Sequence, residues 1–158
     1  MKIQNFLILL VVTLVTFTSC KKGGLIRNGA VQIEFLKVPA EEQKVTLDSN
    51  VEFIIDFQSR VQIEDVEVIL FVEDASKFRL NNDDKLILKN GVNLTNEPSD
   101  DMIIFKHENS VYESSYEFEE TVDLSNYTLG TNFVLRASAM NNTIEGTQFK
   151  TTYFQKEN

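Results

Sequence analysis

The sequence predicts an all-β protein, because apolar and polar residues alternate along most of the chain from Ala30 onward. Residues typical of turns separate the alternating runs at intervals expected for a β-sandwich or a β-barrel. No segment sustains the 3.6-residue period of an amphipathic helix, and no internal repeat is present. We therefore expect one domain over residues 30–158, an antiparallel sandwich of about seven to eight short strands.

Residues 51–58 give the clearest alternation. One face of the predicted strand is apolar and the other polar, with Val51, Phe53, Ile55 and Phe57 opposite Glu52, Asp56 and Gln58. This period of two is typical of a strand with one buried face. Residues 66–73 predict a central strand, with Val66, Val68, Leu70 and Val72 directed inward. Ile69 and Phe71 make the opposite face of that strand apolar too, so we expect the second sheet or a partner to cover it.

Later segments predict a further strand and two hairpins. In residues 111–122 the even positions share one face: Tyr112, Tyr116, Phe118 and Val122. Asn90-Gly91 is the dipeptide that supplies positive φ angles for a type I′ hairpin turn. Asn141-Asn142, between two alternating runs, predicts a second hairpin.

The C-terminal segment "LSNYTLGTNFVLRASAMNNTIEGTQF" has a glycine and an aromatic, then alternating small and apolar residues, then a polar turn. It resembles the closing strands of immunoglobulin-like and fibronectin type III-like sandwiches. The residues that carry this resemblance are Gly130, Phe133, Leu135, Ala137 and Ala139. The resemblance implies an immunoglobulin-like architecture and nothing more, because this fold hosts unrelated functions.

The amino terminus is typical of a targeting segment. Lys2 provides a minimal positive start, and residues 6–17 form an apolar run of about a dozen residues, too short to cross a bilayer core. We expect residues 1–19 to be a signal peptide. The small-residue pattern of an ordinary cleavage site is missing, because no alanine precedes Ala30.

The residues "FTSC", 17–20, resemble the lipobox of bacterial lipoproteins, in which a small residue precedes a cysteine that becomes lipidated. Phe17 stands where that family usually has leucine. The resemblance implies that Cys20 carries the lipid, that residues 20–29 form a tether, and that the chain sits in the bacterial cell envelope, at the outer membrane because no Asp follows Cys20. The alternative is an ordinary secreted protein with a free thiol.

Composition excludes several functions. The chain has 24 acidic and 15 basic residues, a formal net charge of −9 and no basic stripe, so we expect no nucleic-acid partner. Cys20 and His107 are the only residues of their types, and no catalytic motif is present. We therefore expect a protein that is not an enzyme, without cofactor or metal. Asn81 to Asp84 could supply oxygen ligands to calcium, although an Asx-rich turn explains them more simply.

Two functional hypotheses remain. The first is an envelope-anchored module that binds another protein, as an accessory subunit or adapter. The second is a carbohydrate-binding module that presents exposed aromatic rings to glycans. Tyr153 and Phe154 are the candidate ligand contacts, because neighbouring strand residues point to opposite faces and one ring is exposed unless both faces are covered.

Overall fold

The computed structural model describes residues 30–39, 44–46, 50–143 and 147–157. The expected signal peptide, Cys20 and the tether lie outside these ranges. The described residues form ten strands and one short 3-10 turn. Their bounds are β1 (Gln32–Lys37), β2 (Lys44–Thr46), β3 (Asn50–Gln58), β4 (Ile63–Glu73), η1 (Ala75–Lys77), β5 (Phe78–Leu80), β6 (Leu86–Leu88), β7 (Ile103–Ser110), β8 (Ser115–Asp123), β9 (Asn132–Asn141) and β10 (Gln148–Glu157).

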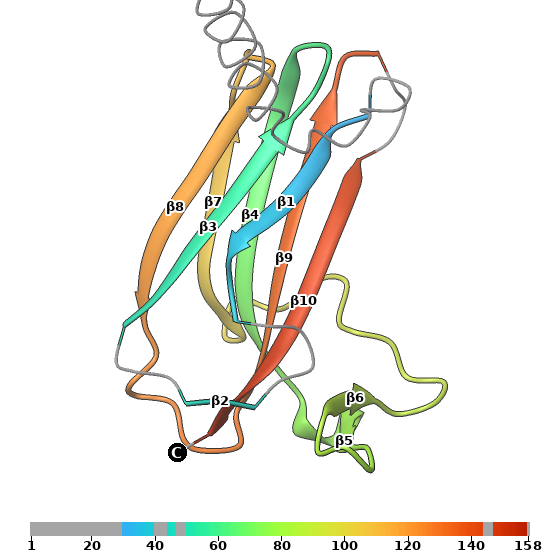
Figure 1. Cartoon of the computed structure of the whole chain (residues 1–158), viewed down its shortest axis with the longest axis vertical. Helices are drawn as coiled ribbons and strands as arrows, with labels where there is room; N and C mark the ends of the chain where they lie inside the picture. Colours follow the sequence, from blue (N-terminus) through green and yellow to red (C-terminus); the bar gives the residue numbers. More distant parts are fainter. Residues whose placement is uncertain (1–29, 40–43, 47–49, 144–146, 158) are drawn as a thin grey trace, which may run out of the picture.

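Two sheets stack face to face along the long axis of the domain (Figure 1). The three-stranded sheet has the order β1-β3-β8, and the five-stranded sheet has the order β2-β10-β9-β4-β7. Neighbouring strands are antiparallel except for the short β2, which runs parallel to β10. The first sheet corresponds to strands A, B and E of an immunoglobulin-like domain, and β4, β9 and β10 correspond to C, F and G. The predicted sandwich of about seven to eight strands is confirmed.

The main core lies between the two sheets. The inward residues predicted for β3 and for most of β4 are buried there, and Phe53, Ile55 and Phe57 are fully inaccessible to solvent. The ring of Phe154 on β10 lies 5.3 Å from that of Phe133 and 6.4 Å from that of Phe53, measured between centroids. Contacts between aromatic rings of both sheets therefore join the two layers.

A second apolar cluster lies on the outer face of the five-stranded sheet. Ile69 and Phe71 of β4 are buried against the β5–β6 hairpin, which contributes Phe78 and Leu86. The hairpin is at the lower end of the domain in Figure 1. The prediction that this face of β4 is apolar and covered is confirmed, but the cover is a hairpin of the same chain, neither the second sheet nor a partner.

The turn predictions had mixed outcomes. The segments on either side of Asn141-Asn142 pair antiparallel as β9 and β10, as predicted. Asn90-Gly91 lies in a tight turn, in which the Val92 amide donates to the Lys89 carbonyl at 3.1 Å. Only Gly91 has a positive φ there, 76°. A type I′ turn needs positive φ at both central residues, so the predicted hairpin is wrong; β6 pairs backward with β5 instead.

Tyr112 also departs from its predicted place. It lies between β7 and β8 with a φ of 58° and with 68% of its surface exposed, whereas Tyr116, Phe118 and Val122 face the core as predicted. The Tyr112 amide donates to the Ile63 carbonyl at 2.9 Å. This hydrogen bond holds together the two segments that pass from one sheet to the other.

In the part of the chain that the structure describes, no helix is long and apolar enough to span a membrane.

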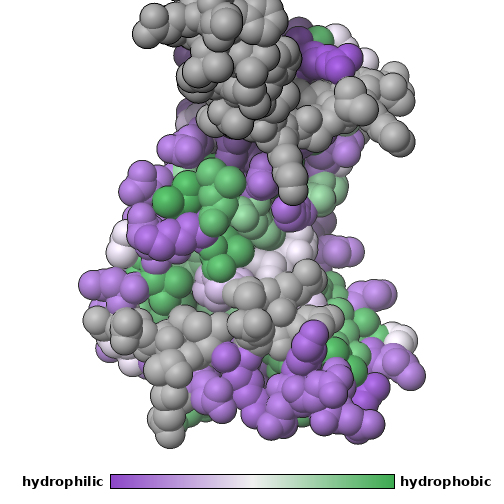
Figure 2. Space-filling view, in the orientation of Figure 1, coloured by the Kyte–Doolittle hydropathy of each residue, from purple (hydrophilic) through white to green (hydrophobic). Residues whose placement is uncertain are grey.

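Figure 2 shows the side of the molecule on which the three-stranded sheet lies. Apolar side chains gather over the middle of this face, and hydrophilic side chains surround them. Leu36, on strand β1 of this sheet, is an exposed apolar residue. Glu117 and Glu119 of the edge strand β8 are exposed, which discourages pairing with other sheet edges. The hollows described below lie on the other sheet.

Candidate functional site

Strand register arranges the outer face of the five-stranded sheet in rows of side chains. Across β10, β9, β4 and β7, paired positions form one row of Phe149, Ser138, Glu67 and Glu108. The row nearer the hairpin contains Thr151, Arg136, Ile69 and Lys106. The row farther from it contains Met140, Asp65 and Ser110. The β5–β6 hairpin covers the lower part of this face, Ile69 included, and leaves the other positions of these rows for other contacts.

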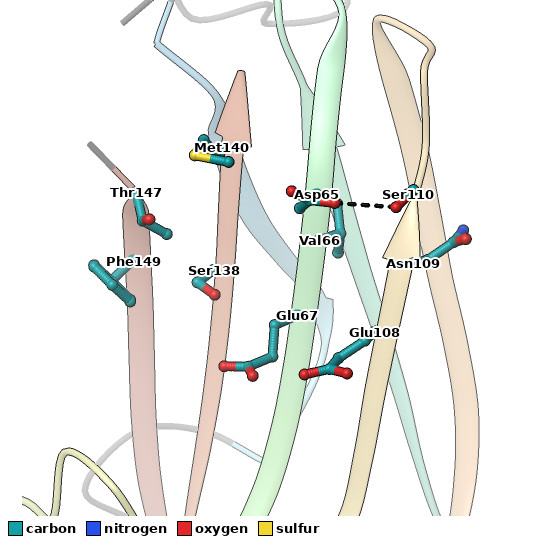
Figure 3. Close-up of a pocket in the computed structure, with 10 residues that line it drawn as sticks. All are labelled: Asp65, Val66, Glu67, Glu108, Asn109, Ser110, Ser138, Met140, Thr147 and Phe149. Atoms are coloured by element: carbon teal, nitrogen blue, oxygen red, sulfur yellow. Dashed lines mark hydrogen bonds between the residues drawn. The ribbon is translucent and has the colours of Figure 1, made fainter. Parts of the chain in front are cut away.

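The upper rows line a hollow of about 580 Å³. Figure 3 shows side chains from β10, β9, β4 and β7 around it, with Ser138 between Phe149 and Glu67. A second hollow, about 740 Å³, shares Glu67 and Phe149 with the first and extends past Arg136 to the loop around Asn96. We call these two adjoining hollows the sheet groove.

The upper part of the sheet groove carries more negative than positive charge. The Lys106 ammonium lies 3.1 Å from Glu67 Oε2 and 2.5 Å from Glu108 Oε1. Hydrogen bonds to Glu108 and Glu67 raise the pKa of Lys106, and the bond from Lys106 lowers the pKa of Glu108. Asp65 accepts a hydrogen bond from Ser110 at 3.0 Å. Three carboxylates and one ammonium group therefore lie in these rows, and the ammonium contacts two of the three carboxylates.

An aromatic ring and the hydroxyl of a largely buried serine lie beside these charges. Phe149, near the start of β10, has 64% of its surface exposed, although it is paired with Ser138 of β9. Ser138 is only 6% exposed and lines the hollow. Among the described residues, no hydrogen-bond partner is found for its hydroxyl. The groove thus offers apolar contact, hydrogen bonding and negative charge within one surface.

The two aromatic residues predicted to contact a ligand are both buried. Phe154 lies in the main core at 0% exposure, and Tyr153 is 9% exposed under the hairpin, with its ring 5.4 Å from that of Phe78. They do point to opposite faces, but both faces are covered, so the prediction of an exposed ring at these positions is wrong. The available ring is that of Phe149, on the same face of β10 as Tyr153 and beyond the edge of the hairpin.

The acidic loop Asn81 to Asp84 forms the tip of the β5–β6 hairpin. Asn81 Oδ1 accepts hydrogen bonds from the amides of Asp83 and Lys85, both at 2.9 Å. This is the Asx-type turn expected from the sequence. Within residues 30–157 as far as they are described, no group of three or more His, Cys, Asp or Glu side chains is placed to hold a metal ion.

His107 is part of the packing between the sheets. It lies on β7 opposite Val68 and is half-buried. Its Nε2 is 2.8 Å from the Tyr116 hydroxyl, and its ring lies 5.1 Å from that of Phe118. Its location on the inner face separates it from the sheet groove.

Comparisons with known proteins add little. No protein-family model matches the chain, and no curated protein matches it. Among solved structures, the chain has a weak match to Spo0M, a sporulation control protein from Bacillus subtilis, with a TM-score of 0.33 and 9% sequence identity. The match covers 82% of this chain, which spans about half of Spo0M (50%).

Proposed function

We propose that this chain is a lipid-anchored protein of the bacterial envelope that acts by binding another protein through the sheet groove, without catalysis. The observation that carries the proposal is Phe149, an exposed aromatic ring on a strand whose other outward ring, Tyr153, is covered by the chain's own hairpin. An exposed ring beside a hollow is typical of a protein contact, because buried aromatic anchors supply much of the binding energy at interfaces.

The anchor in this proposal is supported by the sequence. The apolar run of residues 6–17, the small residue Ser19 and the solitary Cys20 together resemble a lipoprotein signal. Two acyl chains give stable membrane attachment where one gives marginal attachment. Lys21 and Lys22 would add about 1 kcal/mol each at an anionic surface.

A protein partner is favoured over a glycan by the arrangement of the aromatic residues. Tyr153 and Phe154, the candidates for sugar stacking, are buried. Among the described residues, the exposed large aromatic side chains are Tyr112 and Phe149, one in the β7–β8 connection and the other on β10. They do not share a strand or a row, so they do not form a flat aromatic platform.

Crosslinking in the native cell, followed by affinity capture of the tagged chain and mass spectrometry, tests this function. The matched variants are Phe149→Ser and Leu129→Ser. Phe149 lies in the groove, whereas Leu129 lies in the loop before β9, and the groove residue Met140 is at the other end of that strand. Both remove an exposed apolar side chain. We expect one envelope protein to be recovered with the wild type and with Leu129→Ser, and to be lost with Phe149→Ser. Equal recovery with both variants, or no protein above background with the wild type, contradicts the proposal.

A further inference from the structure

We infer that the sheet groove receives an extended segment of the partner in which a lysine or arginine lies close to an apolar side chain. This inference rests on the proposed function and names the partner chemistry of the same surface. It follows from the charge of the groove, from a hydroxyl donor that lines it without an acceptor, and from the spacing between Phe149 and the carboxylates.

The groove carries an excess of negative charge over its whole length. The charged side chains that line it are five carboxylates and two cations: Asp65, Glu67, Glu97, Asp100 and Glu108, with Lys106 and Arg136. Charge complementarity at an interface favours a partner of opposite sign and disfavours one of the same sign. A basic segment is therefore the favoured occupant.

Both cations of the groove are already engaged. Lys106 bridges Glu67 and Glu108. Arg136 donates to the Asn96 carbonyl at 2.5 Å, and its guanidinium carbon lies 5.9 Å from the centroid of the Phe71 ring. Glu67 and Glu108 thus carry two negative charges and share one positive charge. A cation from the partner could bind these two carboxylates without displacing Lys106.

Two donors in the groove lack acceptors among the described residues. One is the hydroxyl of Ser138, a residue 94% of whose surface is buried and which lies between Phe149 and Glu67 (Figure 3). The other is the buried Nε of Arg136, one row closer to the hairpin. The Nε of Arg136 is buried without a partner, which is costly, whereas Ser138 lines the open hollow. Backbone carbonyls of an extended segment are suitable acceptors for the Ser138 hydroxyl, because they recur along such a segment.

The spacing of the row fits an apolar and a basic side chain on one extended segment. Phe149 and Glu67 are separated by two strand spacings, about 10 Å. Side chains on the same side of an extended segment repeat every two residues, about 6.6 Å. An apolar residue on Phe149 thus places a lysine or arginine two positions away within side-chain reach of Glu67 and Glu108.

The test uses the folded chain from Cys20 to Asn158 and three synthetic octapeptides in which every second residue is serine. The positions between the serines alternate leucine with lysine, glutamate or serine, as in Leu-Ser-Lys-Ser-Leu-Ser-Lys-Ser, so that the paired residues share one side of the extended peptide; the peptides are called Leu/Lys, Leu/Glu and Leu/Ser. Binding is measured by titration at low and high salt, with chitotriose and CaCl₂ as probes for the glycan and cation alternatives. The variants are Glu67→Lys with Glu108→Lys in the groove, and Glu117→Lys with Glu119→Lys on the edge strand β8. Both double variants change the net charge equally.

We expect the Leu/Lys peptide to bind, and to bind more weakly at high salt, because exposed ion pairs are screened. The groove double variant should lose at least ten-fold in affinity for Leu/Lys and gain affinity for Leu/Glu, whereas the β8 double variant should change less than two-fold. Lys106→Met should tighten binding of Leu/Lys about two- to five-fold, because it removes the competing ammonium. Phe149→Ser should weaken the binding of all peptides.

Four results overturn the inference: no binding of Leu/Lys up to about 1 mM, equal binding of Leu/Glu by the wild type, equal losses in the two double variants, or binding of chitotriose or Ca²⁺ in place of the peptide. Equal losses in the two double variants would assign the effect to net charge. Binding of chitotriose or Ca²⁺ would assign the groove to a different class of ligand. If cellular capture depends on Phe149 but not on Glu67 and Glu108, the proposed function stands and the inference on partner chemistry fails.

Discussion

Glu73, at the end of β4, is a buried carboxylate that connects three segments. Its side chain is inaccessible to solvent and lies 2.9 Å from the Lys77 ammonium. It accepts hydrogen bonds from the Thr95 amide at 2.7 Å, the Thr95 hydroxyl at 3.0 Å and the Asp74 amide at 3.0 Å. Burial raises the pKa of this carboxyl, but the hydrogen bonds and Lys77 together bring the pKa below its usual value.

Glu73→Gln should therefore lower the free energy of unfolding at pH 7 by about 1–3 kcal/mol, because it weakens hydrogen bonds to a charged group. A lowered pKa in the folded state gives stability that is present above the unfolded-state pKa of glutamate and is lost as the pH falls through the folded-state pKa. Urea unfolding from pH 7 to pH 3 measures this. The difference between wild type and variant should shrink as the pH falls. Glu119→Gln, on an exposed position of β8, should stay within about 0.5 kcal/mol of the wild type at every pH.

At the scale of elements, the β5–β6 hairpin decides which part of the five-stranded sheet remains open. Alternation along β4 predicts that Ile69 and Phe71 need a cover. The sequence does not show what covers them, because the contact joins Phe78 to Tyr153, which are far apart in the chain. For the same reason the alternation in β10 correctly predicts opposite directions for Tyr153 and Phe154 but not the burial of both. The groove residue Phe149 was missed because it shares a face with Tyr153 and differs only in lying beyond the hairpin.

Phe78→Ala tests the role of the hairpin as a cover. We expect a loss of about 3–5 kcal/mol in the free energy of unfolding, the usual cost of removing a buried phenylalanine side chain, and increased binding of a hydrophobic dye by the exposed face of β4. Denaturant unfolding and dye fluorescence measure the two effects. Leu80→Ala removes an exposed side chain from the same strand and should change neither. A cost below about 1 kcal/mol for Phe78→Ala, at the low end for core truncations, would show that the hairpin is not packed on the sheet.

At the scale of the whole molecule, the period-two alternation was sufficient to predict the sandwich, because each central strand has an apolar face whose direction follows from its sequence. The order of strands in the two sheets depends on long-range pairing, such as β3 with β8 and β4 with β9. The resemblance of residues 124–149 to immunoglobulin-like strands predicts the architecture, but it does not give that order. The groove could not be predicted, because it exists only where four strands from distant parts of the chain align their rows.

The described core extends from Val31 to Phe154, all of it after Cys20 in the sequence, so we expect anchoring and folding to separate. The test starts from a chain with the substitutions Phe17→Ala and Ser19→Ala. These place small residues at the last and third-last positions before Cys20, so that an ordinary signal peptidase can cleave there without lipidation. Adding Cys20→Ala to that chain should move the protein from the membrane pellet to the soluble fraction with an unchanged melting temperature. The matched control keeps Cys20 and should stay in the pellet until detergent is added, because two acyl chains hold it there. If the Cys20→Ala chain remains in the detergent-free pellet, lipidation of Cys20 is not the anchor; if it is released but unfolded, the domain depends on the residues that precede Ala30.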